Sequence, residues 1–120
     1  MQVPEFLLRR LYVKGSLRNE DGGFAFDLQN SLGSGYAEQV LPLLVDDAEI
    51  PMRAARFVVD GVSTGFAEVT PDAPFTLAMN ANVTVVVEGR TLAPGKHRIT
   101  LGFVVTGMGE MQFDVTDVME

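Results

Sequence analysis

The stretch HRITLGFVVTG, residues 97–107, alternates apolar and polar side chains over one long run. Its apolar face consists of Ile99, Leu101, Phe103 and Val105. Residues 110–118, EMQFDVTDV, repeat the alternation after a turn rich in glycine. A period of two predicts half-buried β-strands, and the β-branched and aromatic residues of these runs suit a pleated surface.

The rest of the chain shows the same short runs separated by turn residues. We expect further strands at 11–17, 24–29, 39–45, 56–60, 66–70, 75–79 and 83–87. Residues 52–57 are the best helical segment, which is too short to be stable alone. Short strands at this spacing favour an antiparallel sandwich over βαβ units. The sequence therefore predicts an all-β protein: one domain, residues 1–120, folded as a single antiparallel β-sandwich of the immunoglobulin or fibronectin type.

Composition excludes several classes of function. The chain of 120 residues has nine Lys and Arg against sixteen Asp and Glu, a net charge of −7. Binding to nucleic acid or to anionic membranes needs basic surface, so we expect neither. The absence of cysteine excludes disulfides, thiolate zinc sites and a cysteine nucleophile. The N-terminal segment lacks the order of a secretory signal and no run could span a bilayer, so a cytoplasmic protein is expected.

The only histidine, His97, lies in TLAPGKHRIT, residues 91–100. Leu92, Pro94 and Gly95 form an L-x-P-G corner of the kind that connects the two sheets of immunoglobulin-like sandwiches, because proline fixes φ and glycine accepts positive φ. His97 has the parity of Ile99, which predicts a place at the rim of the core and a hydrogen bond to the loop backbone. A catalytic role is the alternative, although general acid–base chemistry needs a positioned partner.

Acidic residues gather in two places, which are Asp46, Asp47 and Glu49, and Asp114, Asp117 and Glu120. Neither group has the dense, glycine-centred spacing of a calcium loop. We interpret both as solvated turns and strand exteriors, and we assign no catalytic residue and no metal ligand to this chain.

Apolar residues are in surplus near the N-terminus and at the last turn. The resulting partner-interface candidates are Phe6, Leu7, Tyr12, Met108 and Met111. Methionine and aromatic side chains suit adaptable interfaces, and filling of the core is the alternative explanation.

Five segments together resemble the small β subunit of bacterial C-glycoside deglycosidases, nearly from end to end. They are LYVKGSLRN (11–19), GFAFDLQNSLGSG (23–35), PFTLAMN (74–80), TLAPGKHRITLGF (91–103) and FDVTD (113–117). The resemblance implies a larger TIM-barrel α subunit that carries the catalytic residues and a divalent metal, expected to be manganese. That complex is a lyase, which cleaves the carbon–carbon bond of a small-molecule 3-keto C-glycoside. This chain would be its non-catalytic subunit, with no cofactor of its own and with turns 33–35 and 107–109 as candidates to approach the substrate.

Two alternatives stay open. The first is a stand-alone immunoglobulin-like binding module, with carbohydrate as its candidate ligand. Sugar-binding faces usually expose aromatic side chains, and this chain has no tryptophan and only Tyr12 and Tyr36 as tyrosines. The second alternative, an independent metal-dependent enzyme, has the least support.

Overall fold

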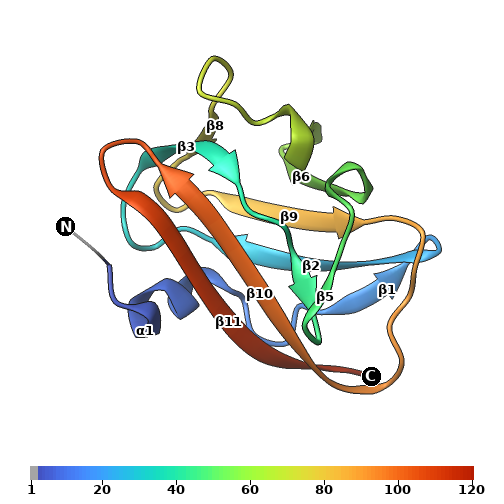
Figure 1. The fold of residues 1–120 in the computed structure, drawn as a ribbon. Coiled ribbons are helices and arrows are strands. Elements are labelled where there is room, and N and C mark those ends of the chain that lie inside the picture. Colours follow the sequence, from blue (N-terminus) through green and yellow to red (C-terminus); the bar gives the residue numbers. More distant parts are fainter. Residues whose placement is uncertain (1–2) are drawn as a thin grey trace.

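The computed structural model describes residues 3–120 as two antiparallel β-sheets packed face to face, with little helix (Figure 1). The first sheet has the order β1 (Arg18–Glu20), β2 (Gly23–Gln29), β9 (Asn82–Val87), β6 (Ala55–Val59) and β7 (Val62–Gly65). The second has the order β5 (Ala48–Glu49), β4 (Leu44–Val45), β10 (Gly95–Val105), β3 (Gly35–Val40) and β8 (Phe75–Leu77), with β11 (Gly109–Met119) paired to β10. The predicted all-β antiparallel class is confirmed.

The long hairpin of β10 and β11 dominates the second sheet. Its register is continuous from Gly95 opposite Met119 to Val105 opposite Gly109. The other edge of β10 pairs with β4 and then with β3. In Figure 1 this hairpin crosses the strands of the first sheet obliquely. The predicted apolar face of β10 is confirmed, because each of its four members is buried between the sheets.

Stacked aromatic rings join the two sheets. Phe57 of β6 stacks on Phe75 of β8 with ring centroids 4.4 Å apart, and on Phe66 at 4.5 Å. Phe103 of β10 lies 6.1 Å from the same ring. Offset aromatic pairs contribute about 0.5–1.5 kcal/mol beyond their buried area, so Phe57 is a central contact between the layers.

The N-terminal segment differs from the prediction. The expected strand at 11–17 is wrong, because a short helix α1 (Glu5–Leu8) and a 3₁₀ turn η1 (Arg9–Leu11) precede a single bridge between Tyr12 and Leu28. Leu8 and Tyr12 are both buried. Tyr12 is extended, and beyond it the amides of Gly15 and Leu17 donate to Asp117 instead of to a neighbouring strand.

Two other strands were also misplaced. The expected strand at 39–45 is divided into β3 and β4 around Pro42, which cannot donate a ladder hydrogen bond. Residues 66–68 form a 3₁₀ turn η3 (Phe66–Glu68), in which Glu68 accepts a hydrogen bond from the Gly65 amide at 2.7 Å. The strand in this region is instead β7, which lies between the strands predicted at 56–60 and 66–70.

The helical prediction at 52–57 holds only for a 3₁₀ turn η2 (Met52–Ala54), after which β6 begins. Strands predicted at 24–29, 56–60, 75–79 and 83–87 are present with small changes of boundary. Within residues 3–120, no helix has the length and apolar character needed to cross a bilayer.

Candidate functional site

A pocket of about 300 Å³ opens at one end of the two sheets. We call it the end pocket. Its lining includes Leu28, Phe57, Phe75, Val83, Phe103 and Val105 from the core. Leu8 and Leu11 of the N-terminal segment contribute one side, and Met108 and Met111 contribute another. The end pocket is therefore built by strands from both sheets and by the segment that precedes β1.

Asn30 fixes the loops at the mouth of the end pocket. Its side-chain amide donates to the carbonyl oxygens of Gly33 at 2.6 Å and Leu77 at 3.1 Å. Its side-chain oxygen accepts from the amides of Leu32 at 3.2 Å and Gly33 at 3.3 Å. The backbone amide of Asn80 donates to the Asn30 carbonyl at 2.6 Å. Asn30 thus joins the loop after β2 to the loop before β9, and its polar atoms are engaged by protein.

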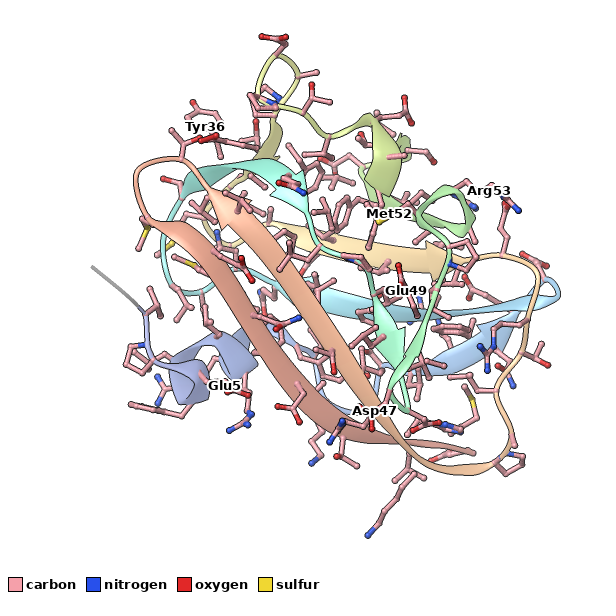
Figure 2. The ribbon with its side chains drawn as sticks, in the orientation of Figure 1. Glu5, Tyr36, Asp47, Glu49, Met52 and Arg53 are labelled. Atoms are coloured by element: carbon pink, nitrogen blue, oxygen red, sulfur yellow. The ribbon has the colours of Figure 1, made fainter. Side chains whose placement is uncertain are left out.

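Three segments, 30–36, 77–82 and 106–109, join strand ends at the mouth and contain no charged residue. We call this region the uncharged end. Four of its side chains are large, apolar or aromatic, and exposed: Leu32 (38%), Tyr36 (55%), Met79 (52%) and Met108 (38%). The turns at the opposite end of the sheets contain charged residues, including Asp21, Asp46, Asp47 and Lys96. Figure 2 shows Tyr36 beside the β10–β11 turn and Asp47 at the opposite end of the hairpin.

His97 holds the corner that precedes β10. Its Nε2 lies 2.7 Å from the Ala93 carbonyl oxygen, as the predicted contact with loop backbone requires. Its Nδ1 lies 2.6 Å from a carboxylate oxygen of Asp46, and the other oxygen of Asp46 accepts from the Arg98 amide at 2.9 Å. The histidine therefore ties the L-x-P-G corner to the turn between β4 and β5.

Both partners of this contact have shifted pKa values. The Ala93 carbonyl and then the Asp46 carboxylate raise the pKa of His97, against the opposing effect of burial. The Arg98 amide and then His97 lower the pKa of Asp46. Two acceptors on the two ring nitrogens are satisfied together only by the protonated imidazole. The protonated histidine is therefore stabilised, and its role is to hold the L-x-P-G corner against the turn between β4 and β5.

Asp117 is a buried carboxylate with 4% exposure, and the sequence interpretation of this residue as a solvated one was wrong. Its Oδ2 accepts from the Tyr12 hydroxyl at 2.6 Å and from the amides of Gly15 and Leu17 at 3.0 and 3.3 Å. Its Oδ1 accepts from the Val118 amide at 2.8 Å. Burial by itself raises the pKa of Asp117, but these hydrogen bonds outweigh it and lower the pKa. Burial and the same contact raise the pKa of Tyr12.

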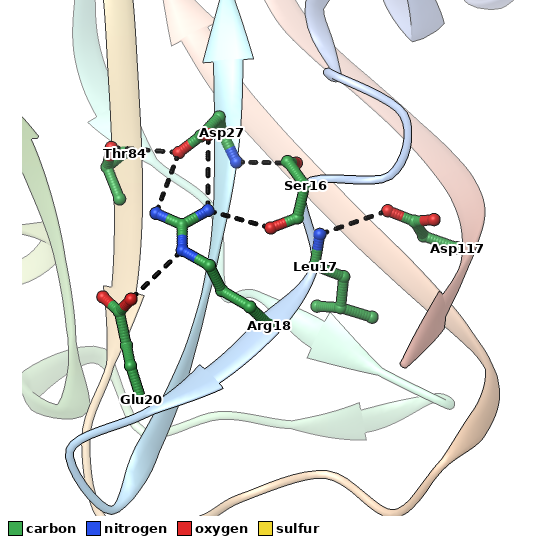
Figure 3. Close-up of polar contacts among 7 residues, drawn as sticks. All are labelled: Ser16, Leu17, Arg18, Glu20, Asp27, Thr84 and Asp117. Carbon is green, nitrogen blue, oxygen red and sulfur yellow. Dashed lines mark hydrogen bonds and ion pairs between the residues drawn. The ribbon is translucent and has the colours of Figure 1, made fainter. Parts of the chain in front are cut away.

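Arg18 organises a second polar cluster beside this carboxylate (Figure 3). Its guanidinium donates to both oxygens of Asp27 at 3.3 Å, to Glu20 at 3.1 Å and to the Ser16 carbonyl at 2.9 Å. Asp27 also accepts from the Thr84 hydroxyl at 3.0 Å. These contacts connect β1, β2 and β9 on the outer face of the first sheet, so we interpret the cluster as structural.

The five partner-interface candidates occupy different environments. Phe6 is exposed on α1, while Leu7 is half-buried. Met108 is exposed at the mouth of the end pocket and Met111 lines it. Tyr12 belongs to the core and offers little surface. The structure thus brings Met108 and Met111 to one site, together with the turn at 33–35, and leaves Tyr12 outside it.

Sequence reasoning missed Leu32, Tyr36 and Met79 as exposed residues of the uncharged end. The available signal was the absence of charge from three loops of a strongly acidic chain. In the part of the chain that the structure describes, no group of three or more His, Cys, Asp or Glu side chains is placed to hold a metal ion.

These features define a small all-β domain whose distinctive surface is an apolar pocket within an uncharged end. The family model described as "Hydroxymethylglutaryl-CoA reductase, N-terminal domain" matches residues 7–120. The chain belongs to this family. Comparison with curated proteins gave no match.

The family match corrects the functional predictions. The resemblance to C-glycoside deglycosidase β subunits was wrong, and with it the lyase activity and the TIM-barrel α subunit as partner. The stand-alone immunoglobulin-like binding module is not supported either. The segments that carried the resemblance are strands, turns and the L-x-P-G corner. Pleat and turn geometry dictate such features in many sandwiches, so they define a fold and leave function open.

Proposed function

We propose that this chain is a docking domain of a hydroxymethylglutaryl-CoA reductase, and that another domain or chain carries out the reduction. The observation that carries the proposal is the uncharged end, where Leu32 and Met108 line the end pocket and the exposed Tyr36 and Met79 lie next to lining residues in the sequence. The family match supports the connection to a reductase.

The described residues do not fit the hydride donor that a reductase requires. Nucleotide phosphates are usually held where a glycine-rich loop leads from a strand into a helix N-terminus. Here the loop at 33–35 leads into strand β3, and α1 has four residues. The side chains best suited to proton transfer are also engaged, since His97 bridges Asp46 and the Ala93 carbonyl and Asp117 accepts from Tyr12.

The uncharged end has the composition of an interface core. Aromatic residues and methionine are enriched in such cores, while Lys, Glu and Asp are depleted. A stable interface buries about 800 Å² on each partner, and a few anchors dominate its energy. Met108 and Tyr36 are the anchors we propose. Phe6 and Leu7 of α1 could extend the contact, because the same segment lines the end pocket through Leu8 and Leu11.

The test uses this chain and the catalytic reductase chain or domain of the same organism. We expect the isolated chain to show no hydroxymethylglutaryl-CoA-dependent oxidation of NADPH or NADH, and the mixture to form a complex by size-exclusion chromatography with light scattering. Met108→Asp and Tyr36→Asp should each weaken the complex at least about tenfold, as loss of an interface anchor does.

Val118→Asp is the matched control, because Val118 is 48% exposed on the same hairpin but lies near the opposite, charged end. It should leave assembly unchanged. Turnover by the isolated chain, or equal loss of assembly in all three variants with circular dichroism intact, would contradict the proposal.

A cytoplasmic location, expected from the sequence, remains a prediction that the same protein expressed with a fluorescent tag would test.

A further inference from the structure

We propose that the end pocket is a binding site for a compact, uncharged apolar group of a small molecule, either an aryl ring system or an alkyl chain. This site goes beyond docking, because it is formed by this chain alone. The residues that build it come from both sheets and are held by the core, so the site exists whether or not a partner covers the uncharged end.

The size of the pocket limits its ligand. An engineered cavity of about 150 Å³ lined by Leu, Ile and Phe binds benzene. The end pocket has about 300 Å³. It therefore has room for two fused aromatic rings or an alkyl chain of about eight to ten carbon atoms. Ligand sites in proteins begin near this volume.

The lining determines the chemistry. Within the described part of the chain, no charged side chain lines the end pocket. A charge buried there would have no partner and would carry a large desolvation cost. Asn30, the main polar group of the lining, already uses its side-chain amide and oxygen within the mouth loops. Ser34 is the remaining side-chain hydroxyl. An uncharged hydrocarbon surface is the group that this lining accommodates.

The wall of the end pocket is rigid, whereas the side chains at its mouth are flexible. Phe57, Phe75 and Phe103 form a stacked wall that the core holds in place. Met108 and Met111 stand at the mouth, and the flexible thioether adapts to ligands of different shape. A rigid aromatic wall with an adaptable mouth suits both flat rings and short chains.

Methyl NMR gives the most direct test, since Met108 and Met111 are the methionines that line the end pocket within residues 3–120. The chain labelled with ¹³C at the methionine methyl groups is titrated with 2-naphthol and, separately, with octan-1-ol. We expect saturable shifts at Met108 and Met111, while Met52 and Met119 stay unchanged. The two probes decide between an aryl and an alkyl ligand. Naphthalene-1,5-disulfonate, with the same ring and a charge at each end, should bind at least about tenfold more weakly.

Substitutions that fill the end pocket provide a second test of the ligand site. Val83→Phe places a ring inside the end pocket, and Val118→Phe makes the same change on an exposed residue near the far end of the hairpin. The first should weaken probe binding at least about tenfold and the second should not. Ala78→Phe, at the exposed mouth, serves if Val83→Phe does not fold. All variants are checked by circular dichroism.

The outcomes separate this inference from docking. Probe binding with failed assembly overturns only the docking function. Assembly without saturable shifts at Met108 and Met111 overturns the ligand site, and indicates that the pocket receives a side chain of the partner. Equal shifts at all methionines, or unchanged affinity in a folded Val83→Phe or Ala78→Phe variant, also overturn it.

Discussion

At the scale of single residues, Asp117 and His97 play opposite electrostatic roles in joining distant segments. Asp117 is a negative acceptor that fixes the N-terminal segment to β11. His97 is a donor, stabilised in its protonated form, that fixes the corner before β10. The sequence indicated the place of His97 through its parity with Ile99. Asp117 has the same parity as Phe113, and that signal was outweighed by the expectation that carboxylates are solvated.

Asp117→Asn should lower the free energy of unfolding by about 2–3 kcal/mol at pH 7, because the charged acceptor of several buried hydrogen bonds is lost. Urea unfolding measures this difference. The pKa of Asp117 is lowered from its ordinary value of 3.8. Its stabilising contribution is therefore complete above pH 3.8 and disappears as the pH falls through the lower, folded pKa.

Asp114→Asn on the same strand is the control, because the side chain of Asp114 is 36% exposed. Its effect on stability should be well below that of Asp117→Asn, as expected for an exposed ion pair. Equal decreases in the free energy of unfolding for the two variants would show that the buried hydrogen bonds of Asp117 stabilise the fold no more than an exposed ion pair does.

The contribution of His97 to stability should depend on pH in the opposite direction to that of Asp117, and His97→Gln should remove it. The pKa of His97 is raised above 6.5 in the folded protein. Its contribution is therefore complete below pH 6.5 and is lost as the pH rises through the folded pKa. The melting temperature of the wild type should fall relative to that of His97→Gln between about pH 6 and pH 8. If the melting temperatures of the two proteins changed in parallel with pH, the structural role of protonated His97 would be contradicted.

At the scale of elements, strands with regular alternation were predictable and irregular segments were not. The apolar face of β10 follows directly from parity, and β11 lies against the N-terminal segment. Pro42 divided one expected strand because it lacks an amide donor. In the N-terminal segment, Leu8 reaches the core from α1 and Tyr12 reaches it from extended backbone after η1. Contacts of the amides of Gly15 and Leu17 with Asp117, distant in the sequence, replaced the expected strand.

Close approach of β2 and β9 makes one glycine indispensable. A Cβ atom at Gly23 would lie 2.0 Å from the carbonyl oxygen of Val87, within the strand pair. Gly23→Ala should therefore separate these strands and lower the free energy of unfolding by about 3 kcal/mol or more. Urea unfolding provides the measurement.

Gly35→Ala is the matched control, since a Cβ atom there would meet Val105 at an ordinary 3.5 Å. It should change stability by less than about 1 kcal/mol. A Gly23→Ala protein as stable as Gly35→Ala would show that β2 and β9 can move apart at little cost.

At the scale of the whole molecule, the two ends of the sheets differ in charge, and this asymmetry was only partly visible in the sequence. The uncharged loops could be identified from composition once the strands were assigned. The end pocket could not, because Leu28, Phe57, Val83 and Met108 are far apart along the chain and meet only in the fold. Family and function were not predictable from strand and turn motifs, since unrelated sandwiches share them.

The concentration of acidic residues away from the uncharged end predicts a salt response. With a net charge of −7 the folded chain repels itself, and its exposed ion pairs contribute little. Raising NaCl from about 0.02 to 0.5 M shortens the Debye length from roughly 20 Å to 4 Å. We therefore expect the melting temperature at pH 7 to rise by a few degrees.

A charge-matched variant distinguishes screening from a general salt effect. Asp72 and Glu110 are exposed and take part in no ion pair within residues 3–120. Each change to lysine raises the net charge by two, so the double variant has −3 in place of −7. Its melting temperature at low salt should exceed that of the wild type, and NaCl should raise it less, because less repulsion remains to be screened. An equal salt response in both proteins would show that NaCl acts through apolar burial instead, and that self-repulsion does not limit the stability of this fold.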